Sequence, residues 1–331
     1  MDTLRAAIIG CGGIGAKRAK TPKDIRVVSV CDIPEDRAQA LARALPGAEA
    51  STDWKATVRR DDVDLVMVAT VHDMLAPIAA EAAAAGKHVL IEQPGARRTS
   101  ELTPVRDAAA RTGARVRVGF NHRFHRAFIK AREIFDSGAL GRMMFVRGRY
   151  GHGGRPGYDR EWRADPERSG GGELVDQGMH LIDLARWFLG DFNQVKAFTE
   201  TCFWDMPVED NAFLLLRTPQ GQVASLHATW TEWKNLFSFE IFGRGAKLEI
   251  SGLGGSYGVE RLAFYRMLPQ MGPPETTIWE YPMADDSFQR EMEEFVADIR
   301  LGREPSPGIA DAEAALAIVE TVYREAHRDH H

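Results

Sequence analysis

The chain has 331 residues, a net charge of −5 and three cysteines. This length exceeds the usual size of a single hydrophobic core, so we expect two domains. The negative net charge argues against general nucleic-acid binding, and three cysteines, which cannot close a disulfide set, fit a reducing compartment. No apolar run is long enough to cross a bilayer, and the N-terminus has no signal-type apolar region. We therefore expect a soluble, cytoplasmic protein with neither a nucleic-acid nor a membrane partner.

The first informative motif follows the first apolar segment. Leu4–Ile9 runs into the glycine-rich Gly10–Gly15, and a second apolar segment, Arg26–Cys31, ends on Asp32. A G-x-G-x-x-G pattern between a strand and a helix, with an acid at the end of the next strand, is typical of dinucleotide binding. Its glycines allow a tight turn, close backbone approach to a pyrophosphate and close helix–strand packing. The sequence predicts these cofactor-binding residues: Gly10, Gly12, Gly13, Ile14, Gly15 and Asp32.

Asp32 also indicates which dinucleotide binds. A carboxylate at this position accepts hydrogen bonds from a ribose diol and repels a 2′-phosphate. The next residues, Ile33 and Pro34, offer no cation that could offset the repulsion. The sequence therefore favours NAD over NADP, while Arg37, one helical turn further on, leaves NADP as the alternative.

Apolar runs alternate with Ala-, Arg- and Glu-rich helical stretches up to residue 121. This alternation predicts an α/β domain over residues 1–121, a doubly wound, parallel Rossmann sheet. The predicted strands are Leu4–Ile9, Arg26–Cys31, Asp64–Ala69, His88–Ile91 and Val116–Phe120. The predicted helices between them include Arg37–Leu45, Ala76–Ala85 and Glu101–Arg111.

The pattern changes after Asn121, where alternating apolar and polar residues predict a mostly antiparallel α+β domain over residues 122–331. Its predicted helices are Arg126–Asp136, residues 173–189, Ser287–Leu301 and Ala310–His327. Its predicted strands are Met143–Tyr150, Ala212–Arg217, Gln222–Trp230, residues 237–241, Lys247–Ile250 and Leu262–Tyr265, with a loop over Gly151–Gly172.

A carboxylate and an imidazole share a helix face in this second domain. Asp176 and His180 are four residues apart, behind the glycines of Gly170–Gly172, so they lie on one side of a helix. A carboxylate that orients or charges an imidazole suits proton transfer. The alternative is a pair of polar residues on a helix surface.

The loop before this helix is rich in arginine and aromatic residues. Arginine binds phosphate in a bidentate manner, so the loop indicates an anionic ligand, and Trp162 could stack on a ring. The alternative is a solvated loop. We take Tyr158, Trp162 and Arg163 as candidate substrate-binding residues. No metal site is predicted, because the histidines of residues 327–331 have no cysteine beside them and are expected to lie in a solvated terminus.

Five segments together resemble the glucose–fructose oxidoreductase and inositol dehydrogenase (Gfo/Idh/MocA) family. They are Gly10–Gly15, Val68–Thr70, Gly86–Pro94, Val118–Phe124 and Gly170–Asp183. The resemblance implies a dinucleotide-binding N-terminal domain and a C-terminal domain with a large open sheet that supports a homo-oligomer. It also implies hydride transfer between a nicotinamide and a secondary carbon of a sugar or cyclitol.

The resemblance further implies residue roles. His180 stands at the family's usual proton-acceptor position, with Asp176 beside it in the substrate pocket. The matching segments add Thr70 and Glu92 to the cofactor-binding residues and Arg123 to the substrate-binding ones. His72, in the stretch directly after Thr70, is taken as a further cofactor-binding residue.

The chain departs from the family at Gln93. The family tripeptide is Glu-Lys-Pro, whereas this chain has Glu92-Gln93-Pro94. The family lysine polarises the reacting oxygen; Gln93 keeps a hydrogen bond but carries no charge. Because a bond to a charged group is worth more than a neutral one, we expect roughly ten- to a hundredfold slower alkoxide formation unless another cation substitutes. Residues 71–75 also differ, so the nicotinamide edge is expected to be rearranged.

The function predicted from these observations is that of an NAD-dependent oxidoreductase for a sugar or cyclitol, with His180, Asp176 and Gln93 as catalytic residues. The arginine-rich loop adds a nucleotide-linked sugar as a candidate substrate. Two alternatives remain open. One is a redox-neutral enzyme, such as one that eliminates a group through a transient ketone. The other is a sensor that binds NAD without turnover.

Overall fold

The structure is a computed structural model that describes residues 3–20 and 22–329, with side chains described to residue 326. It divides into two compact units. The first contains the residues up to Phe120 together with Phe288–Leu316, and the second contains Asn121–Ser287 together with the residues from Ala317 onward. The sequence predicted one boundary, between residues 121 and 122. It carried no local signal that residues 288–316 return to the first unit, because an amphipathic helix does not reveal which surface it covers.

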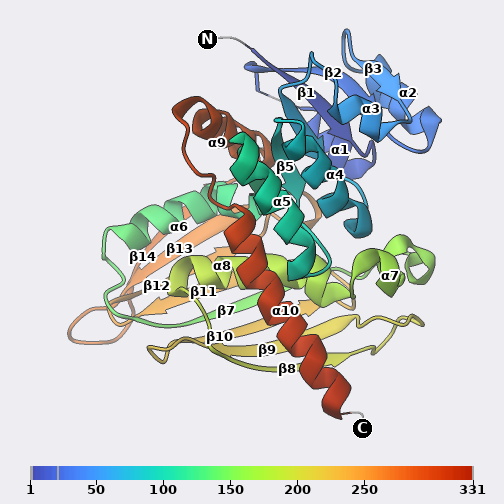
Figure 1. Ribbon diagram of the computed structural model, residues 1–331. Coiled ribbons are helices and arrows are strands. Elements are labelled where there is room, and N and C mark those ends of the chain that lie inside the picture. The colour runs from blue at the N-terminus through green and yellow to red at the C-terminus, as the bar shows by residue number, and fades with distance from the viewer. Residues whose placement is uncertain (1–2, 21, 330–331) are drawn as a thin grey trace. The chain divides into compact units, whose positions relative to one another are not determined.

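The first unit contains a six-stranded parallel sheet, as predicted, with the strand order β3-β2-β1-β4-β5-β6 (Figure 1). The strands are β1 (Leu4–Ile9), β2 (Ile25–Cys31), β3 (Glu49–Ser51), β4 (Leu65–Val68), β5 (His88–Glu92) and β6 (Val116–Gly119). The sequence missed β3 because its three residues, Glu-Ala-Ser, contain no large apolar side chain.

Helices bury the two faces of this sheet. They are α1 (Gly13–Arg18), α2 (Glu35–Arg43), α3 (Trp54–Val58), α4 (His72–Ala84), α5 (Thr99–Thr112) and α9 (Ser287–Leu301). Met292, Phe295 and Val296 of α9 pack into the apolar cluster that contains Ala6 and Ile8 of β1. This packing is the physical reason why residues 288–316 belong to the first unit.

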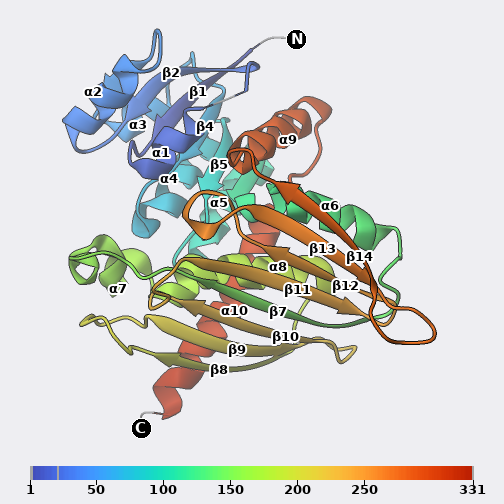
Figure 2. The same ribbon diagram turned by 180° about the vertical axis from the view of Figure 1, so that it is seen from behind.

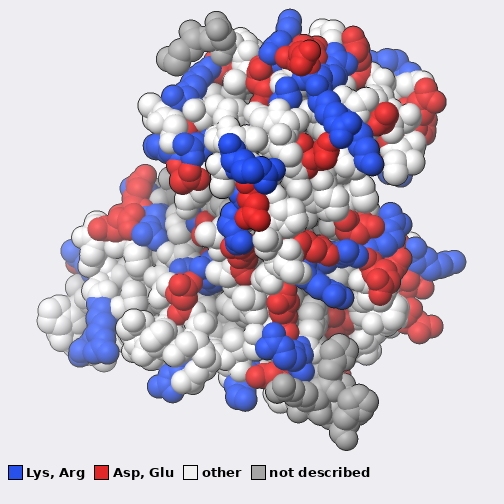
Figure 3. All heavy atoms as spheres, in the orientation of Figure 1, with Lys and Arg blue, Asp and Glu red and all other residues white. Residues whose placement is uncertain are grey.

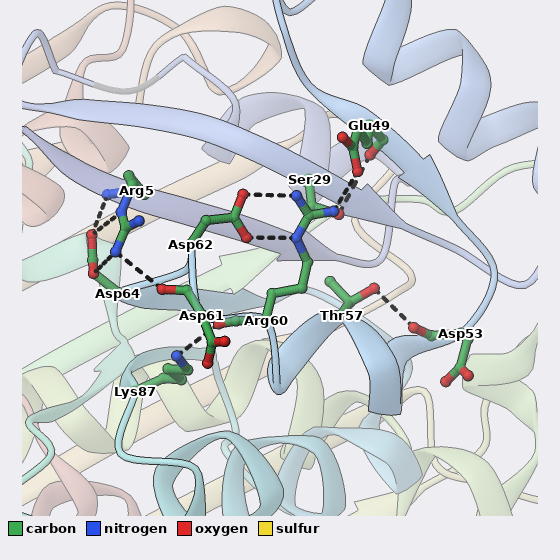
Figure 4. A network of polar contacts seen from close by, with 10 residues as sticks. All are labelled: Arg5, Ser29, Glu49, Asp53, Thr57, Arg60, Asp61, Asp62, Asp64 and Lys87. Atoms are coloured by element: carbon green, nitrogen blue, oxygen red, sulfur yellow. Dashed lines mark hydrogen bonds and ion pairs between the residues drawn. The ribbon is translucent and has the colours of Figure 1, made fainter.

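Ion pairs hold the amino ends of the parallel strands together (Figure 4). Arg5 in β1 forms an ion pair with Asp64, just before β4, at 2.8 Å. The ammonium of Lys87, just before β5, donates to the backbone oxygen of Arg60, and Arg60 also pairs with Glu49 of β3 at 2.5 Å. This polar network lies at the opposite strand ends from Gly10 and Asp32. The carboxyl ends, where open α/β sheets bind ligands, thus remain available.

The second unit contains an eight-stranded sheet with the order β14-β13-β12-β11-β7-β10-β9-β8. Its strands are β7 (Met143–Gly151), β8 (Gln194–Glu200), β9 (Asn211–Arg217), β10 (Val223–Thr229), β11 (Leu236–Gly243), β12 (Ala246–Ser251), β13 (Glu260–Arg266) and β14 (Glu275–Tyr281). Only β7 and β10 pair in parallel, so the predicted antiparallel character is confirmed. The edge strands β8 and β14 were missed because they carry many polar, exposed residues.

Helices α6 (Arg126–Asp136) and α8 (Met179–Leu189) lie on one face of this sheet (Figures 1 and 2). The last helix, α10 (Ile309–Asp329), begins in the first unit and ends in the second. Strands alternate accordingly: in β11, Phe237, Phe239 and Ile241 are buried, whereas the residues between them are half-buried. Within the described part of the second unit, no helix lies over the opposite face of the sheet in either view.

Two local features differ from the sequence prediction. Residues 151–172 are not an open loop but contain three short helices, Tyr158–Arg160, Trp162–Ala164 and α7 (Pro166–Ser169). The helix predicted from residue 173 begins with a π-helical turn, Leu174–Gly178, before α8. A π-turn inserts an extra residue into the helical repeat, and such turns are frequent at functional sites.

The surface carries charges of both signs. On the face shown in Figure 3, lysine and arginine side chains are interspersed with aspartate and glutamate. Many form ion pairs, such as Arg97 with Glu101 at 2.7 Å and Arg106 with Glu313 at 2.5 Å. None of the described helices is long and apolar enough to span a membrane.

Candidate active site

Two glycines of the first motif are required by packing within the unit. Gly10 has φ +98°, and a Cβ on it would lie 2.4 Å from the backbone oxygen of Ala69. A Cβ on Gly15 would lie 1.9 Å from the backbone oxygen of Gly10. Both distances are far below contact, so a side chain at either position would force the turn after β1 away from β4 or from α1. These two glycines fix the path of the loop.

The other two glycines face open space. A Cβ built on Gly12 or Gly13 would meet no atom within 4 Å, and Gly13 is exposed. No intramolecular contact therefore accounts for glycine at these positions. Backbone without side chains at the carboxyl end of β1 is what a pyrophosphate needs for close approach, so these residues fit a bound dinucleotide.

Asp32 lies beside this loop. Its Oδ2 accepts a hydrogen bond from the backbone N–H of Cys11 at 2.8 Å, which orients the carboxylate at the end of β2. The thiol of Cys11 is buried, and burial raises its pKa to about 12. Cys11 is thus an unreactive packing residue, and Asp32 is the polar group that the loop presents at this strand end.

Of the other predicted cofactor residues, Thr70 lies closest to the glycine loop. A Cβ on Gly10 would be 3.0 Å from the backbone nitrogen of Thr70. His72 begins α4 and is buried. Glu92 ends β5 and forms an ion pair with Arg18 at 2.5 Å. The structure therefore gathers these residues at the carboxyl ends of neighbouring strands, β4 and β5.

Arg18 and Glu291 form a buried ionic centre that the sequence did not predict. The guanidinium of Arg18 pairs with Glu291 of α9 at 2.6 Å as well as with Glu92. Gly119 allows this arrangement, since a Cβ there would lie 2.9 Å from both Arg18 and Glu92 atoms. The only sequence signal was an arginine shortly after the glycine motif. This centre fixes the strand end that carries Gln93.

Gln93 follows Glu92 directly and is half-buried. Its side-chain oxygen is buried, and within the described chain it has no hydrogen-bond partner. An amide oxygen without a partner is costly in the interior. Gln93 thus has an unused acceptor at the carboxyl edge of β5, which a ligand hydroxyl could satisfy.

In the second unit, His180 lies in the first turn of α8. Its ring is buried and stacks on His122, with ring centres 3.8 Å apart, and Tyr150 packs against both rings. Burial is the main cause that lowers the pKa of His180 to about 3, although the charge of Asp176 acts in the opposite direction. His180 is therefore neutral at neutral pH, which is the form that accepts a proton.

Asp176 is on the π-turn that precedes α8 and is bound by an arginine. The Nε of Arg163 donates to Oδ2 of Asp176 at 2.7 Å, and the guanidinium of Arg163 stacks over the ring of Trp162 at 4.4 Å. Three residues that the sequence named separately thus form one connected group. The charge of Asp176 also acts on His180.

The glycines before this helix are explained by packing rather than by a ligand. A Cβ on Gly171 would lie 2.0 Å from the hydroxyl of Tyr323, and one on Gly172 would lie 2.0 Å from the backbone oxygen of Glu209. The sequence predicted a close backbone approach here without identifying the partner. Glu209 and Tyr323 are that partner, and Tyr323 donates to Glu209 at 2.7 Å.

Arg123 and Tyr158, both predicted to bind substrate, are buried. The guanidinium of Arg123 forms two hydrogen bonds with Asp183, at 2.8 and 2.5 Å. This geometry gives Arg123 a structural role between the start of the second unit and α8. Tyr158 packs on Trp230, and Asp176 and Arg163 act on its hydroxyl, so Tyr158 remains next to the Arg163–Asp176 group.

Two of the four arginines of residues 151–172 form short ion pairs with neighbouring acids. Arg155 pairs with Glu161 at 2.6 Å, as Arg163 does with Asp176. Within the described residues, no group of three or more His, Cys, Asp or Glu side chains is arranged to hold a metal ion. The histidine-containing segment 327–331 lies outside the residues whose side chains are described.

Two family profiles match the chain. The profile described as an oxidoreductase family with an NAD-binding Rossmann fold matches residues 4–120. The profile of the GFO/IDH/MocA C-terminal domain matches residues 128–249. Together they cover most of the chain and parts of both compact units.

Named relatives are similar along most of their length. Levoglucosan dehydrogenase of Pseudarthrobacter phenanthrenivorans is 29% identical, over 88% of this chain and 86% of the relative. Inositol 2-dehydrogenase of Rhizobium meliloti is 27% identical, over 97% of this chain and 96% of the relative. A solved structure of levoglucosan dehydrogenase in complex with NADH has a TM-score of 0.88 at 23% identity, covering 98% of this chain and 97% of that one, and supports the fold.

Proposed function

Because the chain belongs to the Gfo/Idh/MocA family of NAD-binding oxidoreductases that act on sugars or cyclitols, we propose that it is a dehydrogenase for a secondary alcohol of an uncharged sugar or cyclitol. The observation that carries this proposal is the buried imidazole of His180, which is stacked on His122 and subject to the charge of Asp176. A neutral imidazole under the influence of a carboxylate is the arrangement that general-base removal of a hydroxyl proton requires.

Bound NAD supplies the hydride acceptor in oxidation and, as NADH, the hydride donor in reduction. The open space at Gly12 and Gly13 would accommodate its pyrophosphate, and the Asp32 carboxylate, held by the backbone N–H of Cys11, would accept from its ribose hydroxyls. During oxidation, an imidazole nitrogen of His180 takes the proton of the substrate hydroxyl. Asp176 stabilises the imidazolium that forms.

Gln93 is proposed to bind the substrate as a hydrogen-bond acceptor. Its unpaired, buried oxygen would accept a hydrogen bond from a substrate hydroxyl, and its amide N–H groups could donate to the reacting oxygen. Such neutral bonds stabilise an alkoxide less than a lysine would. We therefore propose that Gln93 positions substrate, with a weaker electrostatic contribution to the rate.

The charge of the second unit supports an uncharged substrate over a nucleotide-linked one. Arg155 and Arg163 are already paired with Glu161 and Asp176, so a phosphate bound by either of these two arginines would compete with a formed ion pair. The guanidinium of Arg163 also stacks over the ring of Trp162, so this arginine already has two partners within the protein. Levoglucosan and inositol, the substrates in the relatives' names, are both uncharged.

We propose in addition that the protein forms a homo-oligomer through the helix-free face of the eight-stranded sheet. That face carries exposed apolar side chains, including Phe198, Phe213 and Leu215, and Phe198 and Phe213 are cross-strand neighbours. The face also carries charged side chains of both signs, such as Arg147 and Glu240, which form an ion pair at 2.9 Å. A second copy would bury the apolar residues and meet charges of both signs.

The proposal is tested with NAD and a panel of levoglucosan, inositol, free sugars and nucleotide sugars, followed by NADH absorbance. We expect an uncharged member to give NADH, and we expect His180→Ala to lower kcat by about a hundredfold or more while calorimetry shows unchanged NAD binding. His88→Ala, at the amino end of β5, is the matched control and should keep its activity.

Each alternative gives a different result. Substrate conversion without net NADH would indicate a redox-neutral enzyme. Tight binding of a sugar and NAD without conversion would indicate a sensor. Near-normal activity of His180→Ala would show that the proton acceptor is another residue.

A further inference from the structure

Three loops of the second unit meet at one end of its sheet. They follow β7, β8 and β10, and the pairing of the strands brings their ends together. Gly151 at the end of β7 is paired with Thr229 of β10, which is in turn paired with Asn211 at the start of β9. In both views the loop between β8 and β9 lies at the same end of the sheet as α7 (Figures 1 and 2). These loops, although far apart in the sequence, are therefore neighbours.

Two large aromatic side chains of these loops are exposed. Phe203, after β8, is 56% exposed, and Trp233, after β10, is 70% exposed. Their ring centres are 4.8 Å apart, with the ring planes at 84°. Trp204 adds a third ring, whose centre lies 5.3 Å from that of Phe203. We call Phe203, Trp204 and Trp233 the aromatic shelf. Apolar surface of this kind is unfavourable in water, so a ligand that covers it gains free energy.

A buried carboxylate holds the shelf in place. Asp210 is fully buried and accepts hydrogen bonds from three consecutive backbone N–H groups. They belong to Cys202, Phe203 and Trp204, at 2.8, 2.8 and 2.9 Å. The indole N–H of Trp204 also donates to the backbone oxygen of Trp230 at 3.1 Å. Rings that are fixed before binding lower the entropic cost of binding, so the shelf has the preorganisation of a ligand site.

The shelf is continuous with the group around Asp176. The ring of Trp204 lies 5.8 Å from that of the buried Tyr158, measured between centres. The charges of Asp176 and Arg163 act on the hydroxyl of Tyr158. One side chain, Tyr158, thus connects the shelf with residues beside the proposed base.

The backbone after β7 provides a second and more accessible connection. His152 and Gly153 are half-buried, and the charge of Asp176 acts on the imidazole of His152. The backbone oxygen of His152 accepts from the N–H of Glu232 at 3.2 Å. A Cβ on Gly153 would lie 3.5 Å from Cε3 of Trp233. A ligand bound at Asp176 would therefore extend along this backbone onto Trp233.

The size and chemistry of the shelf favour a sugar ring over a protein partner. An aromatic side chain buries about 150–250 Å² when it is covered, so two exposed rings supply well under the ~800 Å² per partner of a stable protein interface. One face of a pyranose ring carries mainly C–H groups, which are attracted to the negative face of an aromatic ring. Glu232 and Lys234, on either side of Trp233 in the chain, carry opposite charges, which suits an uncharged ligand.

We propose that the aromatic shelf binds the second pyranose ring of a glycoside whose first ring is oxidised beside His180 and Asp176. This inference rests on the proposed function and makes it more specific. The substrate class is a glycoside of an uncharged sugar or cyclitol, and the same sugar or cyclitol without the second ring is a poorer substrate. Because the shelf contacts only the ring that does not react, it contributes to affinity and leaves the hydride and proton steps unchanged.

Binding is measured first, without turnover. Titration calorimetry of the NADH complex, in which the alcohol cannot be oxidised, compares levoglucosan with cellobiosan, inositol with galactinol, and glucose with cellobiose. In the wild type, the two-ring member of at least one pair should bind about tenfold more tightly. This advantage should fall to twofold or less in Phe203→Ala and Trp233→Ala and persist in Trp233→Phe, which keeps a ring. Equal affinity within every pair, or an undiminished advantage in both alanine variants, would overturn the inference.

The second test follows NADH formation with the pair that shows the difference. In the wild type, kcat/KM should be about tenfold higher for the two-ring member, mainly through KM. Trp233→Ala should raise KM for that member about tenfold, with its kcat and both constants of the single-ring member within about twofold. Leu301→Ala, at the end of α9, is the control because Leu301 is 68% exposed, and this variant should keep the wild-type preference.

The outcomes separate this inference from the proposed function. Tighter binding of two-ring sugars, with no NADH formed from any sugar, would support the shelf and count against the dehydrogenase. NADH formed equally well from both members of every pair would support the dehydrogenase and refute the shelf. A Trp233→Ala protein that keeps the sugar preference but sediments as a smaller species would also refute the inference, and would make the shelf a contact between copies of the chain.

Discussion

Gln93 is the residue at which the sequence analysis predicted a departure from the family's chemistry. The resemblance predicts a lysine at this position, directly after Glu92, which forms an ion pair with the buried Arg18. The side-chain oxygen of Gln93 is buried and has no partner in the described chain. The neighbouring Glu92 is thus held by an ion pair, whereas the side-chain oxygen of Gln93 is free to accept a hydrogen bond. A substitution at position 93 is expected to change the rate of the reaction more than the stability of the fold.

We predict that Gln93→Lys raises the rate constant of hydride transfer in the oxidation direction by about tenfold or more. An ammonium beside the reacting oxygen stabilises alkoxide character more than a neutral amide. Single-turnover measurements with the substrate found in the panel test this across the pH range. Gln39→Lys, on the exposed side of α2, controls for the added charge. Unchanged rates in Gln93→Lys would place the residue away from the reacting oxygen.

At the scale of elements, the turn from β1 into α1 contains glycines that serve two different purposes, close packing and access for a ligand. Gly10 and Gly15 are required by contacts within the first unit, while Gly12 and Gly13 face open space. A single motif thus contains residues needed for folding and residues free to meet a ligand. The two purposes can be tested separately, because different glycines of the same turn serve them.

We predict opposite outcomes for alanine at two of these positions. Gly15→Ala should destabilise the protein without cofactor by about 1–3 kcal/mol, since its Cβ would lie 1.9 Å from the backbone oxygen of Gly10. Gly13→Ala should leave stability unchanged or slightly improved, because alanine is favoured over glycine in a helix, and should weaken NAD binding. Thermal unfolding without NAD, together with titration calorimetry, measures both effects. Equal loss of stability in the two variants would contradict this division.

At the scale of the whole molecule, the eight-stranded sheet is asymmetric. Its buried face is covered by α6 and α8, whereas the opposite face has no helix over it (Figures 1 and 2). Phe198 is 73% exposed and Leu215 55% exposed on that open face. Apolar side chains gathered on an uncovered sheet are expected to be buried by another protein surface.

We predict that Leu215→Glu shifts the protein to a smaller species in sedimentation velocity. A carboxylate opposite its own copy would be desolvated and would face a like charge, so association would weaken by about tenfold or more. Ile33→Glu, at a residue 81% exposed in the first unit, is the control and should keep the wild-type assembly. If Leu215→Glu sediments as the wild type does, the oligomer uses another surface or does not form.

The sequence was sufficient for features that depend on local pattern. Apolar runs with helical stretches between them predicted the parallel sheet, and the glycine motif followed by Asp32 predicted the dinucleotide site, because both signals lie within short segments. Helical spacing predicted that Asp176 acts on His180, and the charge of Asp176 does raise the pKa of that imidazole, whereas the direct partner of Asp176 is Arg163. The short β3 and the edge strands β8 and β14 were missed, because few or no buried side chains mark them.

The tertiary structure decided which residues are brought together from distant parts of the chain. It pairs Arg123 with Asp183 and packs Tyr323 onto Gly171, and it buries Glu173 between acids of different segments. No local pattern encodes such contacts, since burial and charge pairing depend on the summed packing of elements that are far apart in sequence. The sequence thus predicted the cofactor class and the candidate base, whereas the fold alone determined that His180 is buried and stacked on His122.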